Sequence, residues 1–165
     1  MSDSSREVSE DAAGFAPAAD DRIRLRLTAD LANLPVVRSV AGTVAAIADY
    51  DIDAISDLKL AVDEVCSTLI TRAAPGAALE CSFAGNGDEV CFEAAVTVRG
   101  EEQVRVDTAS FGWRVLTTLT DRVDTWASPD DGGLPTLHIS IARARAAGGQ
   151  HEQDPRERRP GQRAG

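Results

Sequence analysis

Residues 60–73 read LAVDEVCSTLITRA and decide the fold of this chain. Their apolar residues recur at the spacing of three and four that is typical of one face of an amphipathic helix. Glu64 and Thr68 lie one turn apart on the flank of that face, where side chains four residues apart are neighbours. The pair is either part of a solvated stripe on a surface helix or part of a site, and the rest of the chain has to separate these two interpretations.

Further elements flank this helix on both sides. Residues 22–27 (RIRLRL) alternate between apolar residues and arginines, which predicts an edge strand with one buried side, and Asn33 starts a first helix over about 34–49. The other predicted elements are the helix that contains residues 60–73, strands over 78–84 and 89–98 joined by an Asn-Gly turn, a helix that Ser110 caps, and strands over 122–127 and 136–142. This order predicts an α+β fold, a two-layer sandwich of a mixed, mostly antiparallel sheet with its helices on one face.

The two ends of the chain differ in composition from the middle. Residues 1–21 hold six acidic residues and one Arg, whereas residues 143–165 hold six Arg and three acidic residues. Neither end shows a helical or strand period, so we expect a disordered acidic tail and a disordered Arg-rich tail. Residues 22–142 are then a single domain, long enough to bury one hydrophobic core.

The charge and the apolar runs exclude several classes of partner. The formal net charge is −10, and such an acidic protein lacks the basic face that nucleic-acid binding requires. No apolar run approaches the roughly 20 residues of a membrane span. The N-terminus shows no basic region followed by an apolar stretch, so no signal peptide is visible. We therefore expect a cytoplasmic protein.

The three cysteines do not predict a metal site. Cys66, Cys81 and Cys91 lie within apolar patterns and lack the close pairing of zinc ligands. His138 and His151 are too isolated in the sequence to join them. We expect buried free thiols and no bound metal.

Residues 60–73 resemble the N-box helix of the GHKL (Bergerat) ATPase fold, in the branch of the RsbW- and SpoIIAB-type anti-sigma factors. In that branch the helix reads A-V-x-E-A-x-x-N-x-x-x-H-A. The predicted order of elements is also that of the family, and the resemblance spans about residues 22–142. The helix RSVAGTVAAIA and the segment FGWRVLTTLTDRVD resemble in particular the anti-sigma-F factors of actinobacteria (UsfX/RsbW).

The resemblance implies site residues, but several positions depart from the family pattern. The family's Glu is a general base for a serine hydroxyl and its Asn holds Mg²⁺; Glu64 matches the first, and Thr68, with a shorter reach, stands in place of the second. The Asp that recognises adenine is replaced by Gly100, and a following glycine by Glu102, whose carboxylate would repel phosphates.

The remaining nucleotide boxes are also reduced. About ten residues separate Gly100 from Phe111 where the family has a long ATP lid, too few to close over a triphosphate. Of the G-x-G box only the second glycine, Gly112, remains, because Ser110 replaces the first. The resemblance therefore implies a degenerate nucleotide site with no bound cofactor. In such a site Glu64 is either an ancestral base or a solvated carboxylate.

The implied function is binding. Arg38 matches a basic residue that the family uses against an acidic part of the sigma factor, or it is an ordinary surface Arg, while Asp63 is expected to be plain surface. The resemblance implies a homodimeric anti-sigma factor that sequesters an alternative sigma factor of the sigma-F or sigma-B type and is released by a STAS-type antagonist. The alternative is an active serine protein kinase that binds Mg-ATP and phosphorylates that antagonist. A free-standing sensor-kinase ATPase module is a third interpretation, for which the chain offers no phospho-acceptor helix.

Overall fold

The structure is a computed structural model that describes residues 21–129 and 133–147. Its helices are α1 (Leu34–Ile47), α2 (Ile52–Ile70) and α3 (Phe111–Leu119), with a short 3-10 helix η1 (Leu31–Asn33) before α1. Its strands are β1 (Ile23–Thr28), β2 (Ala78–Gly85), β3 (Glu89–Thr97), β4 (Arg122–Ser128) and β5 (Thr136–Ala144). The order of these elements confirms the α+β prediction.

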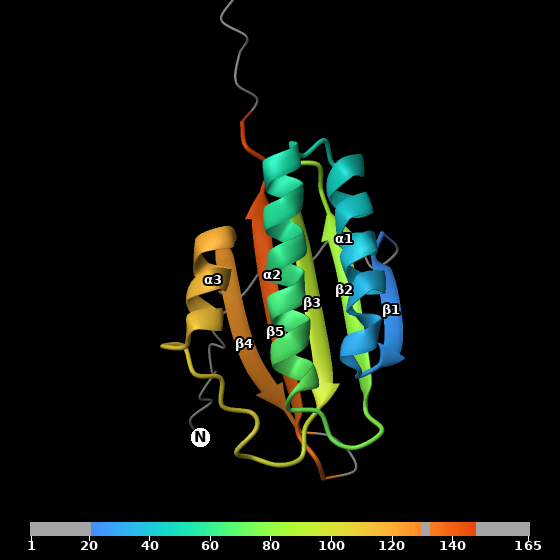
Figure 1. The fold of residues 1–165 in the computed structure, drawn as a ribbon, viewed down its shortest axis with the longest axis vertical. Helices are drawn as coiled ribbons and strands as arrows, with labels where there is room; N and C mark the ends of the chain where they lie inside the picture. Colours follow the sequence, from blue (N-terminus) through green and yellow to red (C-terminus); the bar gives the residue numbers. More distant parts are fainter. Residues whose placement is uncertain (1–20, 130–132, 148–165) are drawn as a thin grey trace, which may run out of the picture.

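The five strands form one sheet in the order β1-β2-β3-β5-β4. We expected a mixed sheet, but every pairing between these strands is antiparallel. The reason is the place of β5: β3 and β4 run in the same direction and would pair in parallel, but β5 lies between them and pairs antiparallel with each. All three helices lie on one face of the sheet, and β1, the strand that carries the arginines, is an edge strand as predicted (Figure 1).

Polar caps set where the helices begin. Asp51 accepts a hydrogen bond from the backbone N–H of Ala54 at 2.7 Å, and Ser110 accepts one from Trp113 at 3.2 Å, so the predicted cap at Ser110 is confirmed. Asn33 precedes α1 as predicted, but its side chain donates to the carbonyl of Thr28 at 2.9 Å. It therefore joins the end of β1 to the start of α1 and leaves the helix N-terminus without a side-chain cap.

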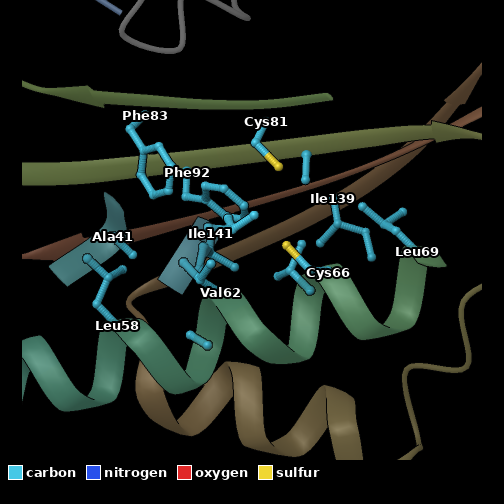
Figure 2. Packing of buried hydrophobic residues seen from close by; sticks show 14 of the residues in the cluster. Ala41, Leu58, Val62, Cys66, Leu69, Cys81, Phe83, Phe92, Ile139 and Ile141 are labelled. Carbon is cyan, nitrogen blue, oxygen red and sulfur yellow. The ribbon is translucent and has the colours of Figure 1, made fainter. Parts of the chain in front are cut away.

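The core lies between the helices and the sheet. Alternate residues of β2, β3 and β5 are buried, and the rings of Phe83 and Phe92 pack with their centroids 4.7 Å apart. Figure 2 shows Leu58, Val62 and Leu69 of α2 beneath these strands. This packing fixes the face of α2 that points outward, and with it the positions of the candidate site residues.

The domain extends slightly beyond its predicted C-terminal limit. β5 reaches Ala144, two residues past the expected end at 142. The Tyr50 hydroxyl donates to the carbonyl of Arg143 and accepts from the N–H of Val90 at 3.0 Å, and burial raises the pKa of Tyr50. Arg143 also lies 3.1 Å from Asp57 of α2. The structure therefore assigns Arg143 to the domain; residues 1–20 and 148–165 of the two predicted tails lie outside the described residues.

The three cysteines are free thiols, as predicted, although only two are buried. Cys66 and Cys81 point toward one another across the core (Figure 2), and the hydrogen bond that the Cys66 thiol donates to Cys81, together with burial, raises the pKa of Cys66 well above its usual value. Cys91 is only half-buried because the alternation of β3 places it on the face of the sheet opposite the helices.

We expect thiol chemistry to start at Cys91. Iodoacetamide reacts with thiolates, and Cys66, with its raised pKa and no exposed surface, offers almost none. Timed alkylation read by peptide mass spectrometry should therefore label Cys91 before Cys66 and Cys81. Labelling of Cys66 before Cys91 would contradict this prediction.

Candidate functional site

An ion pair joins the outer surfaces of α1 and α2. Arg38 of α1 contacts one carboxylate oxygen of Asp63 of α2, with 2.8 Å from Nε to Oδ2 and 2.7 Å from Nη2 to Oδ2. The Asp63 side chain is only 23% exposed, and its other oxygen, Oδ1, is buried without a hydrogen-bond partner. Asp63 is therefore not the plain surface residue that we expected, because the antiparallel packing of α1 on α2 encloses it.

Arg38 keeps the capacity to bind a second anion. Its side chain is 41% exposed, and the guanidinium group has five N–H donors, more than one carboxylate oxygen can occupy. Asp63 holds the guanidinium group in a fixed orientation, so less side-chain conformational entropy is lost when a partner binds. The pair thus presents a pre-oriented cation on the helical surface.

Glu64 contacts the start of α3. A Cβ atom added at Gly112 would overlap the Glu64 carboxylate and lie 2.9 Å from its Cδ. α3 packs beside α2 (Figure 1), so the half-buried carboxylate rests against the second residue of α3. A negative charge at a helix N-terminus is favourable because the first N–H groups have no partners within the helix.

Thr68 lies one turn after Glu64, near the C-terminal end of α2, and Gly100 lies in the segment that follows β3. The carbonyl of Thr68 accepts from Arg72 Nη1 at 2.8 Å and from the Thr71 hydroxyl at 3.0 Å. Gly100 lies in a turn after β3, where its carbonyl accepts from the N–H of Gln103 at 3.1 Å. The structure thus brings Glu64 and Gly112 into contact, while Gly100 has Gln103 as its nearest neighbour.

The connection between β3 and α3 is packed down onto the body of the protein. Val104 and Val106 are partly buried against the core, and Asp107 closes the end of the connection by accepting from the N–H of Ala109 at 2.9 Å. Glu102, in contrast, is exposed. The sequence indicated that this segment is too short for a lid, but it did not reveal that Val104 and Val106 hold the segment against the core. Two valines separated by one residue are only a weak signal of such packing.

The negative charge of Glu64 disfavours the binding of a phosphate in this region. A phosphate about 4 Å from the Glu64 carboxylate would be repelled by about 4 kcal/mol per pair of unit charges at an effective dielectric constant of about 20.

Phe111, which the sequence did not indicate as a surface feature, precedes Gly112 and is 83% exposed. The start of α3 therefore presents an apolar side chain to solvent beside an internal carboxylate.

The contact between Glu64 and Gly112 gives a quantitative prediction. Gly112→Ala raises helix propensity by up to about 1 kcal/mol, but the new methyl group must displace the Glu64 carboxylate. We expect the substitution to stabilise the Glu64→Ala variant more than the wild-type protein, with a coupling free energy of about 0.5–1 kcal/mol. Urea unfolding of the four proteins of this cycle measures the coupling, and additive effects would show that the two residues do not touch.

None of the helices in the described part of the chain is both long enough and apolar enough to span a membrane.

No protein-family model matches the chain. The chain is 38% identical over 128 residues to the anti-sigma-F factor RsbW of Mycobacterium tuberculosis, in both strain CDC 1551 / Oshkosh and strain ATCC 25618 / H37Rv. The aligned region covers 76% of this chain and 74% of the relative. The likeness therefore extends over most of both proteins.

Proposed function

The chain belongs to the family of RsbW-type anti-sigma factors with the GHKL-type fold, and we propose that it sequesters an alternative sigma factor of the sigma-F or sigma-B type by binding alone. The observation that carries this proposal is the likeness to an anti-sigma-F factor over 128 residues, 76% of this chain. The exposed cation of Arg38, held by Asp63, supplies a contact for an acidic part of that sigma factor. Because a sigma factor acts on RNA polymerase, the proposed complex forms in the cytoplasm.

Release by an antagonist completes the proposed cycle. A STAS-type antagonist competes with the sigma factor for the anti-sigma factor, and the displaced sigma factor returns to RNA polymerase. In a transcription assay with a sigma-F-type holoenzyme from the same organism, the protein should inhibit initiation and the antagonist should restore it. Full transcription in the presence of excess protein would overturn the proposed function.

A homodimer is part of the same proposal. We base the homodimer on the face of the sheet opposite the helices, which no described element covers. An antiparallel sheet can leave one face free for water or for a partner. On this face Trp126 stacks on His138 with the ring centroids 5.0 Å apart and the planes at 7°. Trp126 is still 42% exposed, and a half-exposed aromatic residue is of the kind that protein interfaces favour.

The kinase alternative requires Mg-ATP, and the residues present do not fit that ligand. The Glu64 carboxylate already packs against Gly112, and Glu102 adds a second carboxylate. Val104 and Val106 hold the connection that would form a lid against the core. The sequestration that we propose needs no nucleotide.

We expect calorimetry with Mg-ATP to show no binding in the micromolar range, and kinase assays with the antagonist to show no transfer. Thr68→Asn alone should not restore either, because the adenine and phosphate contacts at Gly100, Glu102 and Ser110 would still be absent. Low-micromolar affinity of the wild-type protein for Mg-ATP would contradict this prediction and favour the kinase.

A further inference from the structure

A single lysine lies on the surface that α1 and α2 share. Lys59 of α2 is the only lysine of the chain, whose other basic residues are all arginines. Its carbon chain passes over Gly42 of α1, where an added Cβ atom would lie 3.4 Å from Cδ and 3.8 Å from Cε of the lysine. Because Gly42 has no side chain, the lysine stem can pack on α1 while its ammonium group stays in water.

Lys59 is a neighbour of the ion pair between Arg38 and Asp63. Gly42 follows Arg38 by one helical turn on α1, and Lys59 precedes Asp63 by one helical turn on α2. Side chains one turn apart on a helix have their Cβ atoms about 5–6 Å apart. Since α1 and α2 lie side by side (Figure 1), Arg38 and Lys59 are neighbouring cations on one surface.

Lys59 has no carboxylate of its own in the described parts of the chain. None of the ion pairs within residues 21–129 and 133–147 includes it. Asp63 contacts Arg38 at 2.7 Å instead, and a lysine that precedes an acidic residue by one turn has the weaker of the two orders for a helical ion pair. The chain has 27 acidic and 17 basic residues, so a shortage of carboxylates does not explain this free ammonium group.

We propose that Lys59 is a second contact for the sigma factor, and that Arg38 and Lys59 together bind two carboxylates one helical turn apart on an acidic helix of that partner. The proposal rests on the proposed function and deepens it. Acidic side chains at positions i and i+4 of a helix are separated by the same distance as the two cations. Complementary charges of this kind determine the choice of partner and the rate of association.

Substitutions with a matched control test the contact. With purified sigma factor of the sigma-F type from the same organism, Lys59→Met, which keeps the stem and removes the charge, should raise the Kd about tenfold, and Lys59→Arg should retain most of the affinity. Arg114→Met removes an exposed cation from α3 and should leave the Kd within about twofold. Lys59→Met combined with Arg38→Ala should raise the Kd about a hundredfold, because losses at two separate carboxylates add in free energy.

Chemical modification gives an independent test, because Lys59 is the only lysine. Acetylation with an N-hydroxysuccinimide ester removes the charge of Lys59 and that of the α-amino group. It should weaken binding by the native protein about tenfold and leave binding by Lys59→Arg unchanged, since the α-amino group is modified in both. Reductive methylation, which keeps the charge, should leave the affinity of the native protein within about twofold.

The outcomes separate this inference from the proposed function. Native affinity in Lys59→Met, or an equal loss in Lys59→Met and Arg114→Met, would overturn Lys59 as a contact while the native protein still binds the sigma factor. A double variant that binds no more weakly than Arg38→Ala alone would overturn the pair of carboxylates. Failure of the native protein to bind the sigma factor would instead refute the proposed function, and this inference with it.

Discussion

Arg38→Glu is expected to weaken binding of the sigma factor about a hundredfold, and Arg38→Ala about tenfold. The alanine variant loses one attraction to an acidic part of the partner, worth about 1.4 kcal/mol for a tenfold change. The glutamate variant adds repulsion from the partner to that loss. Titration calorimetry with the purified sigma factor measures both, and wild-type affinity in a folded Arg38→Glu variant would remove this residue from the interface.

Stability has to be separated from affinity in these variants, because Arg38 also neutralises Asp63. Removing the guanidinium leaves a carboxylate that is 23% exposed without its counter-ion, which should lower the free energy of unfolding by about 1–2 kcal/mol. Arg38→Glu should cost more than Arg38→Ala, since it places two carboxylates side by side.

Asp63→Asn is the matched control for this experiment. It breaks the same ion pair but leaves the Arg38 cation at the surface, so it should lower stability slightly and retain sigma binding. Loss of binding in Asp63→Asn to the same extent as in Arg38→Ala would show that the ion pair, and not the Arg38 cation, carries the effect.

Phe92→Ala is expected to lower the free energy of unfolding by about 3–5 kcal/mol, the largest change in stability that we predict. Phe92 has no exposed surface, lies in the middle of β3 on the side that faces α2, and packs on Phe83 with the ring centroids 4.7 Å apart. Truncation removes the buried ring and leaves a cavity that the rigid sheet cannot close. Such a loss approaches the whole stability of a typical domain, so the variant should be partly unfolded at 37 °C.

Trp126→Ala provides the comparison for that experiment. Trp126 belongs to the same sheet but lies on the face without helices and is 42% exposed. Its truncation should cost much less in the monomer than truncation of Phe92. Urea unfolding monitored by far-ultraviolet circular dichroism measures both variants, and a cost below about 1.5 kcal/mol for Phe92→Ala would contradict the described core.

Local patterns in the sequence predicted the elements well because helices and strands impose short periods on it. The alternation in residues 89–98 and the cap at Ser110 depend only on near neighbours in the chain, and the structure has them as predicted. The insertion of β5 between β3 and β4 carries no local signal, since it follows from pairing between distant strands. That difference explains why a mixed sheet was expected and an antiparallel one was found.

The candidate site likewise combines residues that the sequence indicated with contacts that it did not. Resemblance of residues 60–73 to a known helix identified Glu64 and Thr68 from the sequence, whereas the partners of these helices could not be predicted from it. Asp63 was expected at the surface because its neighbour Arg38 is 25 residues away in sequence, on another helix. The contact of Glu64 with Gly112 likewise depends on how α3 packs beside α2.

The measurement that tests the central claim most directly is titration of the purified wild-type protein with the sigma factor of the sigma-F type from the same organism, performed without nucleotide and again with Mg-ATP. We predict a tight complex, with a Kd in the nanomolar to low-micromolar range and the same value in both titrations, because we propose that sequestration needs no nucleotide. No complex in either titration, or a complex that forms only with Mg-ATP, would contradict the account.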